Sequence, residues 1–157
     1  MDIELAYDYP ALQRQIDLLT YYRGEAAKRE DVNADLQQTS EDNADVLKGF
    51  LATACNNAAA LCAKRMVTVD YSLTDTALLF HLSPTHEENV YLVPLLKKAL
   101  EDYLVNHCIY EWMLTMREEW ALTYLHLQPA CETSLEKIMA MLYRRRVRRR
   151  STDLAGI

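Results

Sequence analysis

The scarcity of glycine and proline is the feature that most restricts what this chain can fold into. An all-β sandwich or barrel needs many turn residues, and 157 residues here include only Gly24, Gly49 and Gly156, with Pro10, Pro84, Pro94 and Pro129. Half of the residues are apolar, so a chain of this length can bury a sizeable core as one domain. These observations predict a mainly α-helical fold.

Apolar residues at three- and four-residue spacing locate the first two helices. The first is predicted from about Pro10 to Glu30. An acidic, amide-rich and solvated connection follows over residues 30–45. The second helix carries an apolar face from Leu47 to Leu61, and Thr39 and Asp42 are expected to cap its start.

After the second helix, apolar residues recur at every second position. This alternation predicts a β-hairpin over residues 67–82. We then expect a third helix from about Glu87, which extends to about Leu127 and Pro129 if it is unbroken, and a last helix from about Ser134. The sequence leaves the continuity of the third helix open. The predicted fold is a bundle of about four helices with one β-hairpin inserted between helices 2 and 3.

The stretch from Tyr103 to Met116 is apolar on nearly every face of its helix. Such a helix lies either at the centre of a bundle or against another subunit. The large side chains of this region are therefore candidates for an oligomer interface: Tyr103, Tyr110, Trp112, Met113, Met116 and Trp120. Tyr21 and Tyr22 are further candidates for a subunit contact. Stacking of the aromatic cluster on nucleic-acid bases is an alternative interpretation.

Charge divides the chain into an acidic body and a basic end. Residues 1–143 hold 11 basic and 22 acidic side chains, a net charge of −11, whereas residues 144–157 hold six arginines and one acid, a net charge of +5. We therefore predict a helical domain over 1–143 and a C-terminal arm over 144–157. Six guanidinium groups repel one another and favour an anionic partner, which makes these residues the predicted partner-binding site: Arg144, Arg145, Arg146, Arg148, Arg149 and Arg150.

The arginine run has three interpretations. The plainest is a helix end whose cations interact with the terminal carbonyl groups. The second is contact with nucleic acid, which the acidic body would confine to this arm. The third is an acidic protein surface, such as the 30–45 segment of another copy or a neighbouring ring, against which the arm would extend the last helix. A membrane is the weakest partner and is not predicted.

Motifs for catalysis are missing from the sequence. Neither a glycine-rich phosphate loop nor a G-x-S-x-G nucleophile motif occurs. His107 and Glu111 share a helix face, but no Glu-x-x-His pair accompanies them, so we interpret His107 as a histidine at the core edge with a satisfied hydrogen bond. The predictions are no enzymatic activity, no metal and no cofactor.

The cysteines and the lack of a long apolar run indicate where in the cell the protein is expected. The four cysteines show no C-x-x-C spacing and lie in apolar or helical surroundings, which indicates reduced packing residues. The first residues are acidic and do not resemble a secretion signal, and no run reaches about 18 uncharged apolar residues. A soluble, intracellular protein is expected.

The order of the predicted elements resembles that of tailed-bacteriophage head-tail connector proteins. It is carried by a helix at Leu12–Leu19, a helix at Leu47–Leu61, a hairpin at Val67–Leu82 and a helix at Leu92–Trp120. The resemblance implies a virion structural protein in the virion or host cytoplasm. It also implies a homo-oligomeric ring stacked on a portal, with the charged arm engaging a neighbouring portal or tail protein. The alternative function is a small helical nucleic-acid-binding protein that uses its arginine run.

Overall fold

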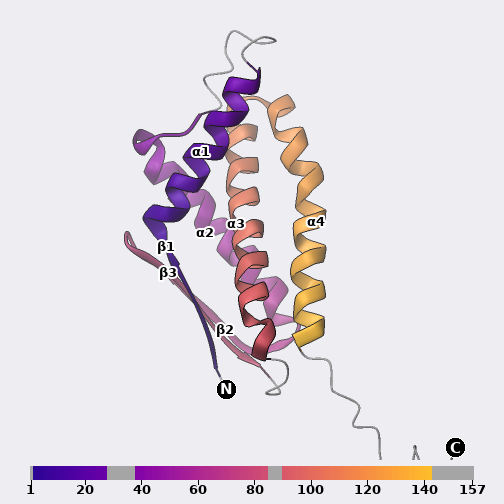
Figure 1. The fold of residues 1–157 in the computed structure, drawn as a ribbon. Coiled ribbons are helices and arrows are strands. Elements are labelled where there is room, and N and C mark those ends of the chain that lie inside the picture. The colour runs from indigo at the N-terminus through magenta and orange to yellow at the C-terminus, as the bar shows by residue number, and fades with distance from the viewer. Residues whose placement is uncertain (1, 28–37, 85–89, 143–157) are drawn as a thin grey trace, which may run out of the picture.

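The mainly α-helical fold is confirmed, with four helices and a small antiparallel sheet among the described residues. A computed structural model of the chain describes residues 2–27, 38–84 and 90–142 (Figure 1). In chain order the elements are β1 (Ile3–Asp8), α1 (Tyr9–Ala27), the 3-10 turn η2 (Glu41–Asn43), α2 (Ala44–Ala63), β2 (Met66–Leu73), β3 (Ala77–Pro84), the 3-10 turn η3 (Val90–Leu92), α3 (Val93–Met116) and α4 (Glu118–Leu142).

The predicted hairpin is present as β2 and β3, and β1 completes a three-stranded sheet that the sequence analysis missed. The strand order is β1-β3-β2, and both pairs are antiparallel. Along β1, Ile3, Leu5 and Tyr7 are buried while the intervening residues are exposed. This two-residue alternation is the signal of a strand with one buried face. The register places Leu5 opposite Phe80, so the apolar sides of β1 and β3 coincide.

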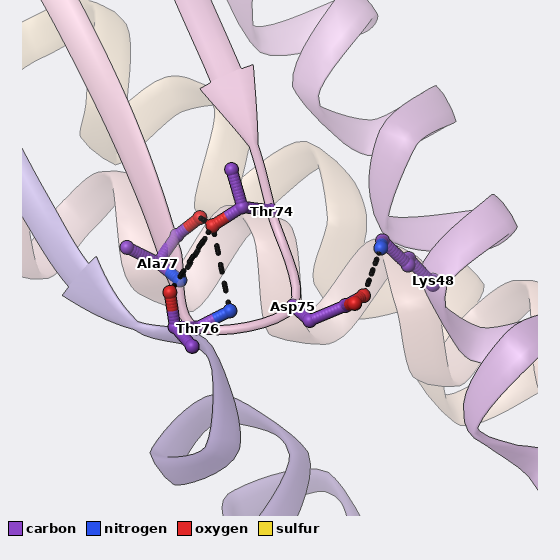
Figure 2. Close-up of polar contacts among 5 residues, drawn as sticks. All are labelled: Lys48, Thr74, Asp75, Thr76 and Ala77. Atoms are coloured by element: carbon purple, nitrogen blue, oxygen red, sulfur yellow. Dashed lines mark hydrogen bonds and ion pairs between the residues drawn. The ribbon is translucent and has the colours of Figure 1, made fainter.

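The turn between β2 and β3 has no Asn-Gly or Asp-Gly pair. Side-chain contacts stabilise it instead. The Thr74 hydroxyl accepts the backbone N–H of Ala77 at 3.1 Å and of Thr76 at 3.4 Å (Figure 2). Lys48 of α2 forms an ion pair with Asp75 at the tip, with Nζ 2.5 Å from the carboxylate oxygen. The hairpin is thereby tied to the start of α2.

Helix α3 is the central element of the fold. It lies between α1 and α4 with α2 behind it (Figure 1), and every residue from 103 to 109 is buried, which covers two turns on all sides. The sheet also reaches this helix, because the Tyr7 hydroxyl donates to the Lys97 carbonyl at 2.7 Å. Helix α3, which is apolar on nearly every side, therefore packs against other elements of the same chain.

The structure answers the open question about the third helix, which is not continuous to Leu127. The chain leaves the helical conformation at Arg117, whose φ and ψ of −163° and 124° are extended, and α4 begins at Glu118. The reversal lays α4 along α3, where Asn106 donates to the Tyr124 carbonyl at 3.2 Å and to Gln128 Oε1 at 2.6 Å. A straight helix would leave the apolar face of α3 in water, so burial favours the break.

Pro129 does not end a helix, contrary to expectation, but lies inside α4. Proline removes one hydrogen bond from a helix, to the carbonyl four residues earlier. Both Pro129 and that residue, Leu125, are exposed, so solvent is available to the unpaired carbonyl. The predicted last helix from Ser134 is thus the C-terminal third of α4.

The connection before α2 is anchored by a buried hydroxyl and not capped as predicted. Thr39 is buried, and its backbone N–H and hydroxyl contact the Thr20 hydroxyl and the Asp17 carboxylate of α1 at 3.0 and 2.5 Å. Because Thr39 is occupied in this way, the capping pair is Ser40 with Asn43, one residue further on. The acidic residues 30–37 lie outside the described residues.

Helix α2 with its preceding turn, Glu41–Ala63, is the one described segment that is long and apolar enough to cross a membrane by length and composition alone. Its apolar face, from Leu47 to Cys62, is buried in the core against α3 and β2. Exposed Asn56 and Asn57 interrupt the opposite side. The described fold therefore contains no clear transmembrane span.

The third strand leads to a stability prediction. Leu5→Ala should lower the free energy of unfolding by about 2 to 5 kcal/mol, because it leaves a cavity against Phe80 in the core. Glu4→Ala, one residue earlier on the exposed face, should change it by less than about 0.5 kcal/mol. Urea unfolding followed by circular dichroism measures both. Equal small effects would show that residues 3–8 do not pack as a strand.

Candidate interaction surface

The six residues predicted to form an oligomer interface are divided between the core and the surface. Tyr103, Trp112 and Met113 are at most 4% exposed, so they stabilise the protomer itself. Tyr110 and Trp120 are partly buried against the core, and Met116 is exposed. Of the two alternatives for this apolar helix, the central position accounts for most of its side chains.

Exposed apolar side chains gather at the end of the molecule formed by the end of α1 and the turn between α3 and α4. These two parts lie together at the top of Figure 1, and Arg23 of α1 donates to the Thr123 hydroxyl of α4 at 3.2 Å. We call this region the apolar end and define it by nine side chains that are 39–60% exposed: Leu18, Leu19, Tyr21, Tyr22, Leu114, Met116, Leu122, Leu125 and Leu127.

Tyr21 and Tyr22 were expected at a subunit contact, and both belong to the apolar end. The leucines of this end were missed by the sequence analysis, although a signal is present. Leu18 and Leu19 are adjacent, and successive helical positions point about 100° apart. Leu122, Leu125 and Leu127 similarly occupy more of α4 than the one face that packs on α3. Some of these leucines must therefore remain in water.

Arg117 organises the turn that carries much of the apolar end. Its backbone N–H donates to the Met113 carbonyl at 2.8 Å, and its own carbonyl accepts from the Trp120 N–H at 3.0 Å. The guanidinium lies over the Trp120 ring, 4.6 Å from the ring centroid, and one nitrogen is 3.2 Å from a Glu119 carboxylate oxygen. Arg117, Glu118, Glu119 and Leu122 line an open hollow beside the turn.

His107 is buried in α3 next to two tyrosine rings. The Tyr103 and Tyr110 ring centroids lie 6.3 and 6.4 Å from the imidazole, and Nε2 is 3.7 Å from a Glu111 carboxylate oxygen. The expected satisfied hydrogen bond is wrong for Nε2, which has no hydrogen-bond partner among the described residues. Burial lowers the pKa of His107, and the nearby Glu111 carboxylate partly opposes that shift.

The cysteines behave as packing residues. All four are free, and Cys55, Cys62 and Cys108 are buried. Burial raises the pKa of the Cys55 and Cys108 thiols to about 12 and that of Cys62 to about 11, so these thiols are poor nucleophiles. Within the described ranges, no group of three or more His, Cys, Asp or Glu side chains is placed to hold a metal ion.

The predicted arginine site, Arg144 to Arg150, lies outside the described residues. The run begins two residues beyond the end of α4. That end lies at the bottom of Figure 1, opposite to the apolar end. No protein-family model matches the chain, and neither a curated protein nor a solved structure matches it.

The lowered pKa of buried His107 leads to a prediction about pH. The ordinary histidine pKa is about 6.5, and its lowering in the fold means that the unfolded chain takes up the proton first as the pH falls. Stability should therefore decrease from pH 7.5 to pH 5.5. His107→Phe, which keeps an aromatic ring but cannot titrate, should flatten this decrease in pH-dependent urea unfolding.

A matched control is available in α4. His126 is exposed, so His126→Phe should retain the pH dependence of the wild-type protein. If the two variants show the same slope as the wild type between pH 7.5 and 5.5, protonation of His107 does not limit stability at acidic pH.

Proposed function

We propose that this chain is a non-enzymatic structural subunit of a phage-like particle that assembles into a homo-oligomeric ring. The observation that carries the proposal is the apolar end, where nine large apolar side chains remain 39–60% exposed. Large exposed apolar side chains that gather at one end of a folded domain mark an interaction site, because burying them in an assembly releases free energy.

A head-tail connector is the particular structural role proposed. The support is the resemblance in element order, a helix, a second helix, a β-hairpin and a long helix, which the fold retains although the long helix ends at Met116. In this role the arginine arm would contact an acidic surface of a neighbouring portal or tail protein. The protein would then reside in the virion or the host cytoplasm.

Self-association is the direct test of the structural role. Light scattering and mass photometry of the full chain should show an oligomer that dissociates on dilution. The physical reason is that association covers the exposed leucines and tyrosines of the apolar end. A strict monomer at millimolar concentration, which stays monomeric when neighbouring proteins are added, would contradict the proposal.

A second candidate function is nucleic-acid binding, which the arginine run specifically favours. Lysine and arginine contacts to phosphates release counterions and make affinity strongly dependent on salt. The acidic body, with a net charge of −11 over residues 1–143, would confine such contacts to the arm.

One set of substitutions tests the role of the arm. Replacing Arg144, Arg145, Arg146, Arg148, Arg149 and Arg150 with glutamine should leave the melting temperature of the isolated protein nearly unchanged. Assembly at physiological salt should be impaired, because exposed ion pairs contribute at most about 1 kcal/mol each and act here as a network. Thermal unfolding and light scattering measure the two effects.

The same comparison separates the arm's candidate partners. Tight DNA binding by the wild type, with log affinity falling against log salt at about −0.9 per neutralised phosphate, would favour the nucleic-acid function. Unfolding of the glutamine variant on its own would instead show that the arginines stabilise the domain.

A further inference from the structure

Two exposed helical faces of this chain have matching apolar residues and opposite charges. On α1, exposed Arg14 precedes exposed Leu18 by four residues, and the Tyr21 and Tyr22 rings follow with centroids 5.7 Å apart. On α4, exposed Glu118 precedes exposed Leu122 by four residues, and exposed Leu125 follows. We call these the α1 face and the α4 face.

Among the described residues, the charged side chain on each face has no ion-pair partner. Arg14 and Glu118 form no ion pair with any part of the chain that the structure describes. Other charges nearby are already engaged, since Arg117 pairs with Glu119 and Arg23 donates to Thr123. One cation and one anion are therefore each available beside an exposed leucine.

The two faces do not cover each other within one protomer. The hydrogen bond from Arg23 to Thr123 is a direct side-chain contact between α1 and α4. At 100° per residue, Leu18 lies about 140° around α1 from Arg23, and Leu122 and Leu125 lie about 100° and 160° around α4 from Thr123. Leu18, Leu122 and Leu125 lie to the side of this contact and remain exposed, so a second molecule has access to both faces.

We propose that a second copy of this chain is that molecule, and that the α1 face of one protomer packs on the α4 face of the next. In the contact Arg14 approaches Glu118, while Leu18 and the tyrosines cover Leu122, Leu125 and the hollow beside Arg117. The contact joins two different surfaces, so its repetition generates a closed ring when the rotation between copies closes. This inference rests on the proposed function, since it supplies the interface of the proposed oligomer.

The interface is tested with one charged substitution on each face. Leu18→Asp and Leu122→Asp, at side chains 52% and 49% exposed, should leave the fold intact and raise the dissociation constant of self-association at least tenfold. Leu95→Asp is the matched control, because Leu95 is 53% exposed but lies near the start of α3, away from the apolar end. Sedimentation velocity of the full chain measures association.

Mixing the two variants is the decisive measurement. A Leu18→Asp chain retains its α4 face and a Leu122→Asp chain retains its α1 face, so the mixture should form a complex of one copy of each. A chain carrying both substitutions should not join either partner through this contact. As a charge test, Arg14→Glu and Glu118→Arg should each weaken association, and the doubly substituted chain should recover it.

The outcomes distinguish the interface from the function. If the wild type associates and both aspartate variants associate equally well, or if Leu95→Asp dissociates the oligomer as much as they do, the inferred contact is wrong and the oligomeric function stands. If the two variants fail to pair on mixing, the two faces do not meet and the inference is overturned. A wild type that is monomeric at millimolar concentration would overturn both.

Discussion

Burial of α3 is the constraint on which the rest of this structure depends. Two complete turns, residues 103–109, have no exposed side, so every other layer must supply a surface that covers them. Helices α1, α2 and α4 pack on α3, and Asn106 hydrogen-bonds to α4. The sheet reaches an earlier part of α3, where the Tyr7 hydroxyl donates to the Lys97 carbonyl. Within the fold, His107 Nε2 is a buried polar atom that this arrangement leaves without a hydrogen bond among the described residues.

The break at Arg117 follows from the same constraint and also determines what is left exposed. Folding α4 back along α3 buries Ala121, Leu135, Met139 and Leu142, which a straight continuation would leave in water. However, at the turn itself only the end of α3 and the start of α4 are available to cover apolar side chains. Leu114, Met116, Leu122 and Leu125 therefore remain exposed near the α3–α4 turn, at the same end of the molecule as the exposed side chains of α1. The candidate interaction surface is therefore a consequence of the chain reversal that buries α3 against α4.

Much of the local structure was predictable because it depends on spacing along the chain. The second helix and the hairpin were found from periodicity, and α1 begins within one residue of its predicted start. The strand at residues 3–8 has the same two-residue alternation and was missed because a strand of six residues without its partner is a weak pattern. The reversal at Arg117 has neither glycine nor proline, and its one local signal is a pair of acids, Glu118 and Glu119, that suit a helix start.

The sequence by itself determined the fold class, the positions of the apolar faces and the separation of an acidic body from a basic arm, because composition and periodicity are properties of the chain alone. The tertiary structure decided which apolar residues are buried. Tyr103 and Met113 were candidates for a subunit contact and lie in the core, whereas Leu18 and Leu122 lie in water. The physical reason is that burial depends on which element arrives to cover a face. Here that depended on a chain reversal that no single residue dictates.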